Sequence, residues 1–444
     1  MSFATLGLFP ALVDALAQAE RTDPTPIQAQ AIPAVLAGRD LLAQAPTGTG
    51  KTLAYALPLL QQALKLSGGP AQRQRDPSAL VLVPTRELAQ QVGEVLRGLV
   101  RGLPPHASAW RSDAPPPPRL RVAVLQGGVS INPQLMALRG GADIVVATPG
   151  RVLDVVAHNA LRLGALKTLV LDEADRLLAL GFADELDRVL ALLPAQRQNL
   201  LFSATYGQGT GGAGAALQAV ADRLLRDPVT LRDESAGTQP PAAIQQRAIT
   251  VDTAQRGPLL RQLLKEMDEP RTLVFVATRH AAELVAEKLL RHGHRAVALH
   301  GELSQGTRWR VLDGLRRGET RVVVATDMAA RGLDIPDLAL VINFDLPRSA
   351  DDHVHRIGRT GRAGATGLAI SFVPPTVEAH FRLIEKRQGQ RVPREVLPGF
   401  APTEVPPPSD PTGGVKGKRK SKKDKLREQA AAAAAAATAP TARR

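Results

Sequence analysis

The stretch from Leu41 to Thr52, LLAQAPTGTGKT, constrains this chain more than any other. A short apolar run leads through small residues and glycine to a lysine and a threonine, which we expect at the first turn of a helix. Glycine lets backbone amides approach phosphate oxygens closely, and the helix N-terminus adds positive potential. The stretch therefore predicts a Walker A phosphate loop, although alanine stands where the motif usually begins with glycine; its residues are Ala45, Pro46, Thr47, Gly48, Thr49, Gly50, Lys51 and Thr52.

Short apolar runs alternate with helical segments along most of the chain. The runs at 79–84, 121–126, 143–148, 168–172 and 199–203 are typical of buried parallel strands, and the pattern restarts at 272–277, 296–299, 321–325, 338–344 and 368–372. A polar, proline-containing segment separates the two sets. The sequence therefore predicts two α/β domains with parallel sheets, at 1–232 and 244–388, joined by a linker at 233–243 and followed by a tail at 389–444.

Acidic side chains follow one of these strands directly. An aspartate at Asp172 can hold the water shell of a magnesium ion opposite Thr52, and Glu173 can orient and deprotonate an attacking water. In the second half, Arg359 and Arg362 are three positions apart, and arginines from a partner domain can stabilise charge during phosphoryl transfer. Taken singly, these stretches are also compatible with an exposed acidic turn and a surface arginine cluster.

Net charge and composition indicate a polyanionic partner. The formal charge is +14, and a dense basic block at 416–427 precedes an alanine run at 430–437. We leave two interpretations of the tail open: a solvated disordered segment, or an auxiliary RNA-binding arm. Because there is no cysteine, no signal peptide and no long apolar run, we expect a soluble, cytoplasmic protein without a membrane segment.

Other strand ends carry glycine, threonine and arginine in place of acids. They lie at 84–91, at Gly127 and Gly128, and at 148–151. Such ends offer helix N-termini and close backbone approach, which suit phosphodiester oxygens, and each is equally compatible with a capped helix or a plain turn.

The motifs together resemble those of the DEAD-box RNA helicases, whose name is spelled by residues Asp172 to Asp175. The resemblance runs from Phe3 to about Arg387 with the motifs in the family's order. It implies two tandem RecA-like domains that hydrolyse ATP with Mg²⁺ and use the energy to unwind RNA. The second domain has no phosphate loop of its own, so the resemblance also implies that two incomplete halves close on nucleotide and RNA together.

The resemblance assigns roles to individual residues. Gln28 would contact adenine with help from Phe3, while Asp334 would contact the ribose. Lys51 and Thr52 would hold phosphates and magnesium, Asp172 would belong to the metal shell partly through water, and Glu173 would be the catalytic base. The arginine fingers would be Arg359 and Arg362, and residues coupling hydrolysis to strand separation would be Ser203, Thr205, Asp175 and His355. The residues implied to contact the RNA backbone are Pro84, Thr85, Arg86, Gly128, Thr148, Arg151, Arg279, Gln305, Arg308, Thr326, Asp327 and Arg331.

The chain departs from the family pattern in three places. Glu20 and Arg21 stand where glycine and an aromatic usually precede PTPIQ, and the Arg21 guanidinium is a candidate substitute for the stacking ring. His353 stands where tyrosine is usual, and the segment at 207–214 is rich in glycine. These departures bear on nucleotide affinity and coupling.

Three hypotheses follow for the activity. The first is an ATP-dependent RNA helicase that unwinds short duplexes locally or remodels ribonucleoproteins, acting as a monomer. The second is an ATP-gated RNA clamp with little unwinding, and the third, a DNA translocase, fits RNA-type motifs poorly.

Overall fold

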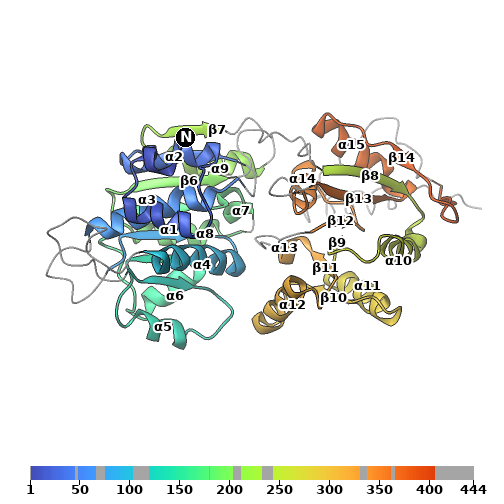
Figure 1. The fold of residues 1–444 in the computed structure, drawn as a ribbon, viewed down its shortest axis with the longest axis horizontal. Coiled ribbons are helices and arrows are strands. Elements are labelled where there is room, and N and C mark those ends of the chain that lie inside the picture. The colour runs from blue at the N-terminus through green and yellow to red at the C-terminus, as the bar shows by residue number, and fades with distance from the viewer. Residues whose placement is uncertain are drawn as a thin grey trace, which may run out of the picture.

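The protein is described here by a computed structural model. It describes residues 2–45, 49–66, 76–103, 120–179, 181–203, 212–232, 244–330, 338–361 and 366–405. These residues form two units, each built on a sheet of seven parallel strands (Figure 1). The linker at 233–243 and the tail beyond 405 lie outside the described residues.

The sheet of the first unit has the order β3-β4-β2-β5-β6-β1-β7. Its strands are β1 (Leu41–Gln44), β2 (Ala79–Leu82), β3 (Val122–Leu125), β4 (Ile144–Ala147), β5 (Thr168–Leu171), β6 (Gln198–Ser203) and β7 (Val229–Arg232). The helical elements of this unit are η1 (Phe3–Leu6), α1 (Pro10–Gln18), α2 (Pro26–Leu36), α3 (Lys51–Leu66), α4 (Arg86–Gly102), α5 (Asn132–Leu138), α6 (Pro149–Ala157), α7 (Ala174–Ala179), α8 (Ala183–Ala191) and α9 (Gly212–Leu224).

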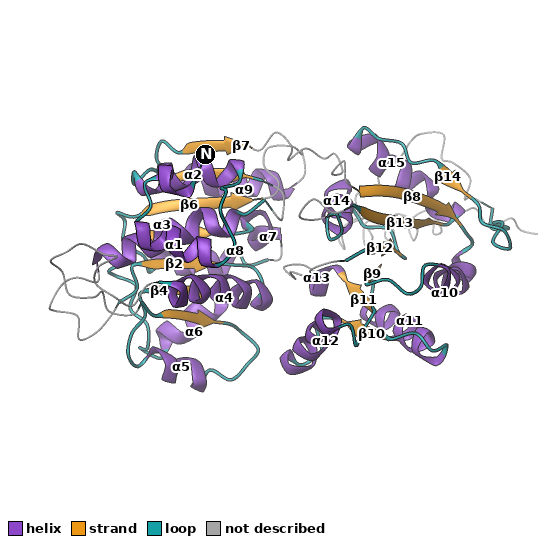
Figure 2. Cartoon of the chain, in the orientation of Figure 1, coloured by secondary structure: helices purple, strands orange, loops and turns teal. Residues whose placement is uncertain are grey.

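Helices cover both faces of this sheet, which explains why its strands are apolar throughout (Figure 2). Along β4, Ile144 and Val146 pack into one core cluster, whereas Val145 packs into the other. Successive side chains of a strand point to opposite faces, so a strand buried on both sides needs an unbroken apolar run. This is the pattern from which the parallel sheet was predicted.

The second unit repeats the arrangement with the order β10-β11-β9-β12-β13-β8-β14. Its strands are β8 (Ile244–Thr250), β9 (Thr272–Val276), β10 (Ala296–Leu299), β11 (Val322–Thr326), β12 (Leu340–Asn343), β13 (Gly367–Val373) and β14 (Arg394–Glu395). Its helical elements are η3 (Thr253–Gln255), α10 (Arg256–Glu266), α11 (Arg279–Arg291), α12 (Gln305–Arg317), α13 (Asp327–Ala330), α14 (Ala350–Ile357), η4 (Pro375–Val377) and α15 (Glu378–Gln388). Two tandem α/β units with parallel sheets confirm the predicted fold class.

The second unit continues beyond residue 388, where the sequence analysis began the tail. Strand β14 pairs with β8, and Phe400 packs into the core at 9% exposure. Thr403 and Glu404 then donate backbone hydrogen bonds of 2.8–2.9 Å to the Asp252 carboxylate. A two-residue strand and one buried aromatic give too weak a pattern to be recognised in the sequence. The second unit therefore extends to Glu404, past the boundary expected at residue 388.

Among the described residues, we find no helix that combines the length and the apolar character needed to cross a bilayer.

Candidate functional site

The phosphate loop joins β1 to α3, as its sequence predicted. Gly50 precedes the first residue of α3 and has a φ of +89°. A Cβ atom at this position would lie 2.2 Å from Gln28 Nε2, so both the backbone conformation and the close approach require glycine. Pro46, Thr47 and Gly48 lie outside the described residues.

Lys51 is held inside the loop that it belongs to. Its side chain is buried, and Nζ donates a 2.7 Å hydrogen bond to the carbonyl oxygen of Ala45. The ammonium group is thus kept beside the loop backbone, where phosphate oxygens bind in this motif.

Gln28 ties the start of α2 to the phosphate loop. Its Oε1 accepts a hydrogen bond from Thr25 N at 3.0 Å, and Nε2 donates to the Gly50 carbonyl oxygen at 3.0 Å. Thr25 Oγ1 donates to the Thr49 carbonyl oxygen at 2.7 Å. The Gln28 amide therefore caps α2 and also contacts the phosphate loop. Any nucleotide contact made by Gln28 would thus depend on the conformation of that loop.

The two residues expected to assist Gln28 differ in exposure. Phe3 is 2% exposed and belongs to the core cluster beneath α2, whereas Arg21 is exposed. Phe3 therefore supports α2 by packing.

The acids after β5 are buried and fixed by hydrogen bonds. Asp172 Oδ1 accepts from Glu173 N at 2.9 Å, and Oδ2 accepts from the hydroxyl of Tyr55 at 2.8 Å. Burial raises the pKa of Asp172, and the nearby Lys51 ammonium opposes this shift. Tyr55 was not predicted from the sequence, because a tyrosine on the buried side of a helix gives no sign of its hydrogen-bond partner.

Glu173 and Asp175 also have defined partners. Glu173 adopts a φ of +49°, and Arg176 Nη1 lies 3.1 Å from its Oε2, with both side chains 7% exposed. Ser203 Oγ donates to Asp175 Oδ1 at 2.7 Å, which brings together two of the residues expected to couple hydrolysis to strand separation. Thr205 lies outside the described residues.

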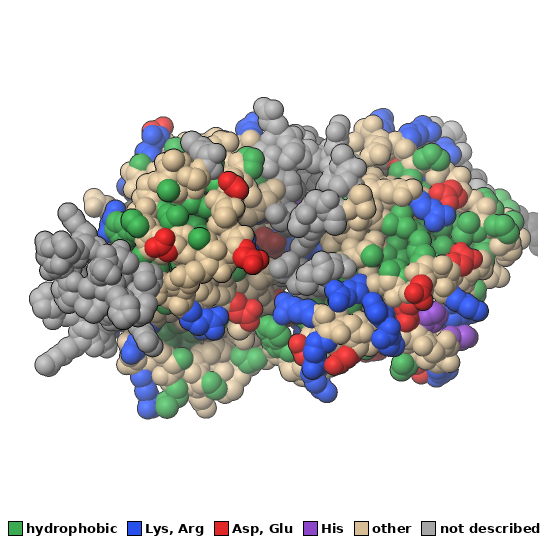
Figure 3. Space-filling model, viewed as in Figure 1, with side chains coloured by type: hydrophobic (Ala, Val, Ile, Leu, Met, Phe, Trp, Pro, Cys, Tyr) green, Lys and Arg blue, Asp and Glu red, His purple; other side chains and the backbone are tan. Residues whose placement is uncertain are grey.

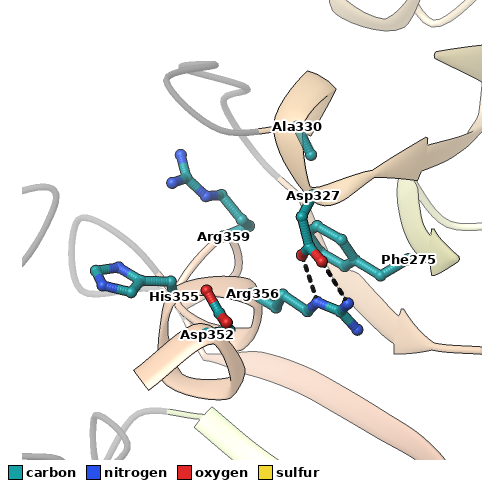
Figure 4. A pocket seen from close by; sticks show the side chains of 7 residues that line it. All are labelled: Phe275, Asp327, Ala330, Asp352, His355, Arg356 and Arg359. Atoms are coloured by element: carbon teal, nitrogen blue, oxygen red, sulfur yellow. Dashed lines mark hydrogen bonds and ion pairs between the residues drawn. The ribbon is translucent and has the colours of Figure 1, made fainter. Parts of the chain in front are cut away.

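The second unit contributes a small cavity at the start of α13 and the end of α14. Figure 4 shows Arg359 and His355 directed away from the ion pair between Asp327 and Arg356. Arg356 contacts both oxygens of Asp327, at 2.7 and 2.8 Å, and its guanidinium lies 4.9 Å from the Phe275 ring centroid.

Arg356 also donates to the carbonyl oxygen of Asp345 at 2.6 Å, so it joins α14 to the ends of β11 and β12. Arg356 was not among the residues predicted from the sequence, although it lies in the same arginine-rich stretch as Arg359. Arg331, Asp334 and Arg362 lie outside the described residues.

Residues of the first unit that were expected to contact RNA lie together. The Arg86 guanidinium packs against Gly128, where a Cβ would be 1.9 Å from Nη1, and Gly128 has a φ of +66°. Thr85 caps α4 by accepting from Leu88 N, and a Cβ on Gly127 would be 4.0 Å from Thr148 Oγ1. The Arg86 guanidinium, the Thr148 hydroxyl and the backbone of Gly127 and Gly128 therefore lie close together.

Three of the expected RNA contacts in this unit are buried. Pro84, Thr148 and Arg151 have little exposed surface, and Arg151 Nη2 donates to the Val129 carbonyl oxygen at 2.8 Å. Arg151 therefore holds the loop that contains Gly128.

In the second unit, two of the residues expected to contact RNA instead contact the first unit. Arg308 Nη1 lies 3.0 Å from Glu87 Oε1, and both side chains are at most 8% exposed. Gln305 Nε2 donates to the same oxygen at 3.4 Å. These contacts join α12 to α4 across the two units.

The remaining expected contacts of the second unit have their own partners. Arg279 is exposed and pairs with Glu302, Thr326 ends β11, and Asp327 is engaged by Arg356. Figure 3 shows lysine and arginine side chains gathered over the part of this unit that contains α12.

Comparison with known proteins agrees with this geometry. A family model described as "DEAD/DEAH box helicase" matches residues 25–210, and one described as "Helicase conserved C-terminal domain" matches residues 255–364. The chain belongs to the DEAD/DEAH box helicase family. The resemblance inferred from the motifs is thereby confirmed, and this DEAD-box protein is an ATP-dependent RNA helicase and an ATPase.

Two relatives from Escherichia coli K12 support the assignment. The helicase is 42% identical to "ATP-dependent RNA helicase DbpA" over 375 residues, which cover 84% of this chain and 76% of that protein. It is 40% identical to "ATP-dependent RNA helicase SrmB" over 391 residues, which cover 88% of this chain and 82% of that protein.

Solved structures share the fold of the helicase. Dbp5 of S. cerevisiae bound to RNA and ADP BeF₃ matches with a TM-score of 0.75 and 31% identity, covering 89% of this chain and 95% of that one. Mss116p bound to single-stranded RNA and AMP-PNP matches with a TM-score of 0.75 at 24% identity, covering 89% of this chain and 80% of that one, which bears on the fold alone.

Proposed function

We propose that this helicase couples ATP hydrolysis to local, non-processive unwinding of short RNA duplexes by closing its two units on nucleotide and RNA together. The observation that carries the proposal is the buried contact of Glu87 with Arg308 and Gln305. It joins α4, which begins beside the Arg86 cluster, to α12 of the other unit. A buried ion pair that forms between units contributes only in the closed arrangement.

The nucleotide site fits ATP with Mg²⁺. Thr52 is the second residue of α3, and Asp172 presents a carboxylate whose two oxygens are oriented by Tyr55 and Glu173. Magnesium prefers one or two protein oxygen ligands and takes the rest from water and phosphates. When bound, the ion neutralises charge on the phosphates.

Glu173 is the proposed general base. Its carboxylate is paired with Arg176 at 3.1 Å in a buried position, so it must leave this partner, or share it, to accept a proton from water. Lys51 has to leave the Ala45 carbonyl oxygen to reach phosphate oxygens. Arg359 and Arg362 are proposed to approach the terminal phosphate from the second unit.

RNA is proposed to bind through its backbone, without readout of sequence. The Arg86–Gly128 cluster supplies phosphate contacts, and exposed arginines over α12 extend the positive surface across the second unit (Figure 3). The arrangement of the units supports closure on RNA: a point variant of yeast Dbp5 bound to RNA and ADP BeF₃ gives a TM-score of 0.74, against 0.66 for the same variant bound to Gle1 and IP6.

The test is RNA-stimulated ATPase activity together with displacement of one strand from a short duplex. Glu173→Gln and Arg359→Ala should each reduce RNA-stimulated turnover by about a hundredfold or more, because they remove the base and a transition-state charge. Undiminished turnover in either variant contradicts the proposal. RNA-stimulated ATPase activity without strand displacement in the unmodified chain would favour the RNA clamp instead.

A further inference from the structure

Tyr55 lies on α3, three positions after Thr52, and its side chain is fully buried. It is 0% exposed, and its ring packs against Phe202 with centroids 5.2 Å apart and planes tilted by 58°. Phe202 directly precedes Ser203 on β6, next to β1 and the phosphate loop. Core packing thus fixes the ring, and the hydroxyl is the group through which Tyr55 makes a polar contact.

The hydroxyl interacts with both side chains assigned to magnesium. It donates a 2.8 Å hydrogen bond to Asp172 Oδ2, and the Thr52 side chain interacts with the same phenol oxygen. In this hydrogen bond the phenol is the donor and the carboxylate oxygen is the acceptor. A buried hydroxyl needs such a partner, because leaving it unpaired is costly.

The consequence for Asp172 is a fixed carboxylate plane. Glu173 N donates to Oδ1 at 2.9 Å, and the Tyr55 hydroxyl donates to Oδ2. These two hydrogen bonds fix the carboxylate plane, and with it the directions of the lone pairs that both oxygens still have available. A partner of this kind orients the group that serves a metal and sets how well the metal binds.

We propose that Tyr55 is a positioning residue for magnesium, whose hydroxyl orients Asp172 beside Thr52 and thereby sets the Mg²⁺ affinity of the nucleotide-bound site. The inference rests on the magnesium role given to Asp172 and Thr52 in the proposed function. Tyr55 does not contact nucleotide in this account, so nucleotide affinity without metal should not depend on its hydroxyl.

The experiment measures binding of N-methylanthraniloyl-ADP to the full chain by fluorescence while free Mg²⁺ is varied, with a parallel titration in EDTA. Tyr55→Phe removes one oxygen atom and keeps the ring. We expect it to require at least about tenfold more free Mg²⁺ for half of the Mg²⁺-dependent gain in affinity. Affinity in EDTA should remain that of the unmodified chain.

Thr168→Val is the matched control. Thr168 is 1% exposed on β5, the strand that leads into Asp172, and its hydroxyl donates to Gln62 Oε1 at 3.0 Å. Like Tyr55→Phe, the Thr168→Val variant loses a buried hydroxyl. The melting temperatures of both variants without nucleotide compare the cost of the two changes in folding stability. A Mg²⁺ shift in Tyr55→Phe and not in Thr168→Val supports the positioning role.

Three results would overturn the inference. An unshifted Mg²⁺ curve in Tyr55→Phe removes the role of the hydroxyl, and equal shifts in both variants assign the effect to general loosening of the core. A missing Mg²⁺ response in the unmodified chain removes the metal assignment of the proposed function itself, and the inference with it.

Discussion

Acid should destabilise the second unit through one buried histidine. His353 is 1% exposed on α14; Gln388 Nε2 donates to its Nδ1 at 3.0 Å, and Nε2 lies 3.4 Å from Ser371 Oγ. Gln388 Nε2 also contacts the Ala350 carbonyl oxygen, so its amide faces the ring with a donor. A proton on Nδ1 would oppose that donor. His353 is therefore held neutral in the folded protein.

Burial, followed by the nearby Arg356 charge, lowers the pKa of His353 to about 3, and Glu385 partly opposes this shift. The unfolded chain binds the proton near pH 6.5, so between these values the unfolded state holds more protons than the folded state. The stabilisation is complete above pH 6.5 and is lost as pH falls. At pH 5 the loss is about 2 kcal/mol, from 1.5 pKa units at about 1.36 kcal/mol each.

The assay is urea unfolding followed by the fluorescence of Trp309, which lies on α12 of the second unit. Trp110 is the other tryptophan of the chain, so a Trp110→Phe background isolates this signal. His353→Gln in the same background removes the titrating group and keeps the remaining histidines. Between pH 7 and pH 5, the chain with His353 should lose about 2 kcal/mol more unfolding free energy than the variant. Equal losses would refute the argument that His353 is held neutral.

Two further predictions concern RNA binding. Arg308→Ala leaves the buried Glu87 without its charged partner in the closed arrangement, which typically costs about 2–5 kcal/mol, so affinity for single-stranded RNA with a non-hydrolysable ATP analogue should fall at least about thirtyfold. Fluorescence anisotropy measures this, and Arg310→Ala, which removes an exposed arginine from the same helix, should weaken RNA binding much less than Arg308→Ala does; equal losses in both variants would contradict the closure contact. Deleting residues 409–444 removes ten lysines and arginines, so RNA affinity should fall and its dependence on salt should flatten, while ATPase activity without RNA stays unchanged. An unaltered salt slope would leave the tail as a solvated appendage.

The sequence by itself determined the fold class and the chemistry of the strand ends. The loop before Lys51 needs small residues and glycine wherever it occurs, and acids directly after an apolar strand mark the carboxyl edge of a sheet. These signals are local, so neighbouring positions in the chain carry them completely. Apolar runs long enough to be buried on both faces likewise predicted parallel sheets.

Only the tertiary structure decided which distant side chains meet. Tyr55 and Asp172 are 117 positions apart in the sequence. They meet because β1, which leads to α3, and β5, which leads to Asp172, end at the same edge of the sheet with only β6 between them, and no motif encodes this strand order. The contact of Glu87 with α12 crosses the two units, and the packing of Phe400 extends the second unit past its expected end. A hydrogen bond or ion pair depends on positions in space, whereas a motif records only spacing along the chain, and burial is what gives each of these contacts its strength.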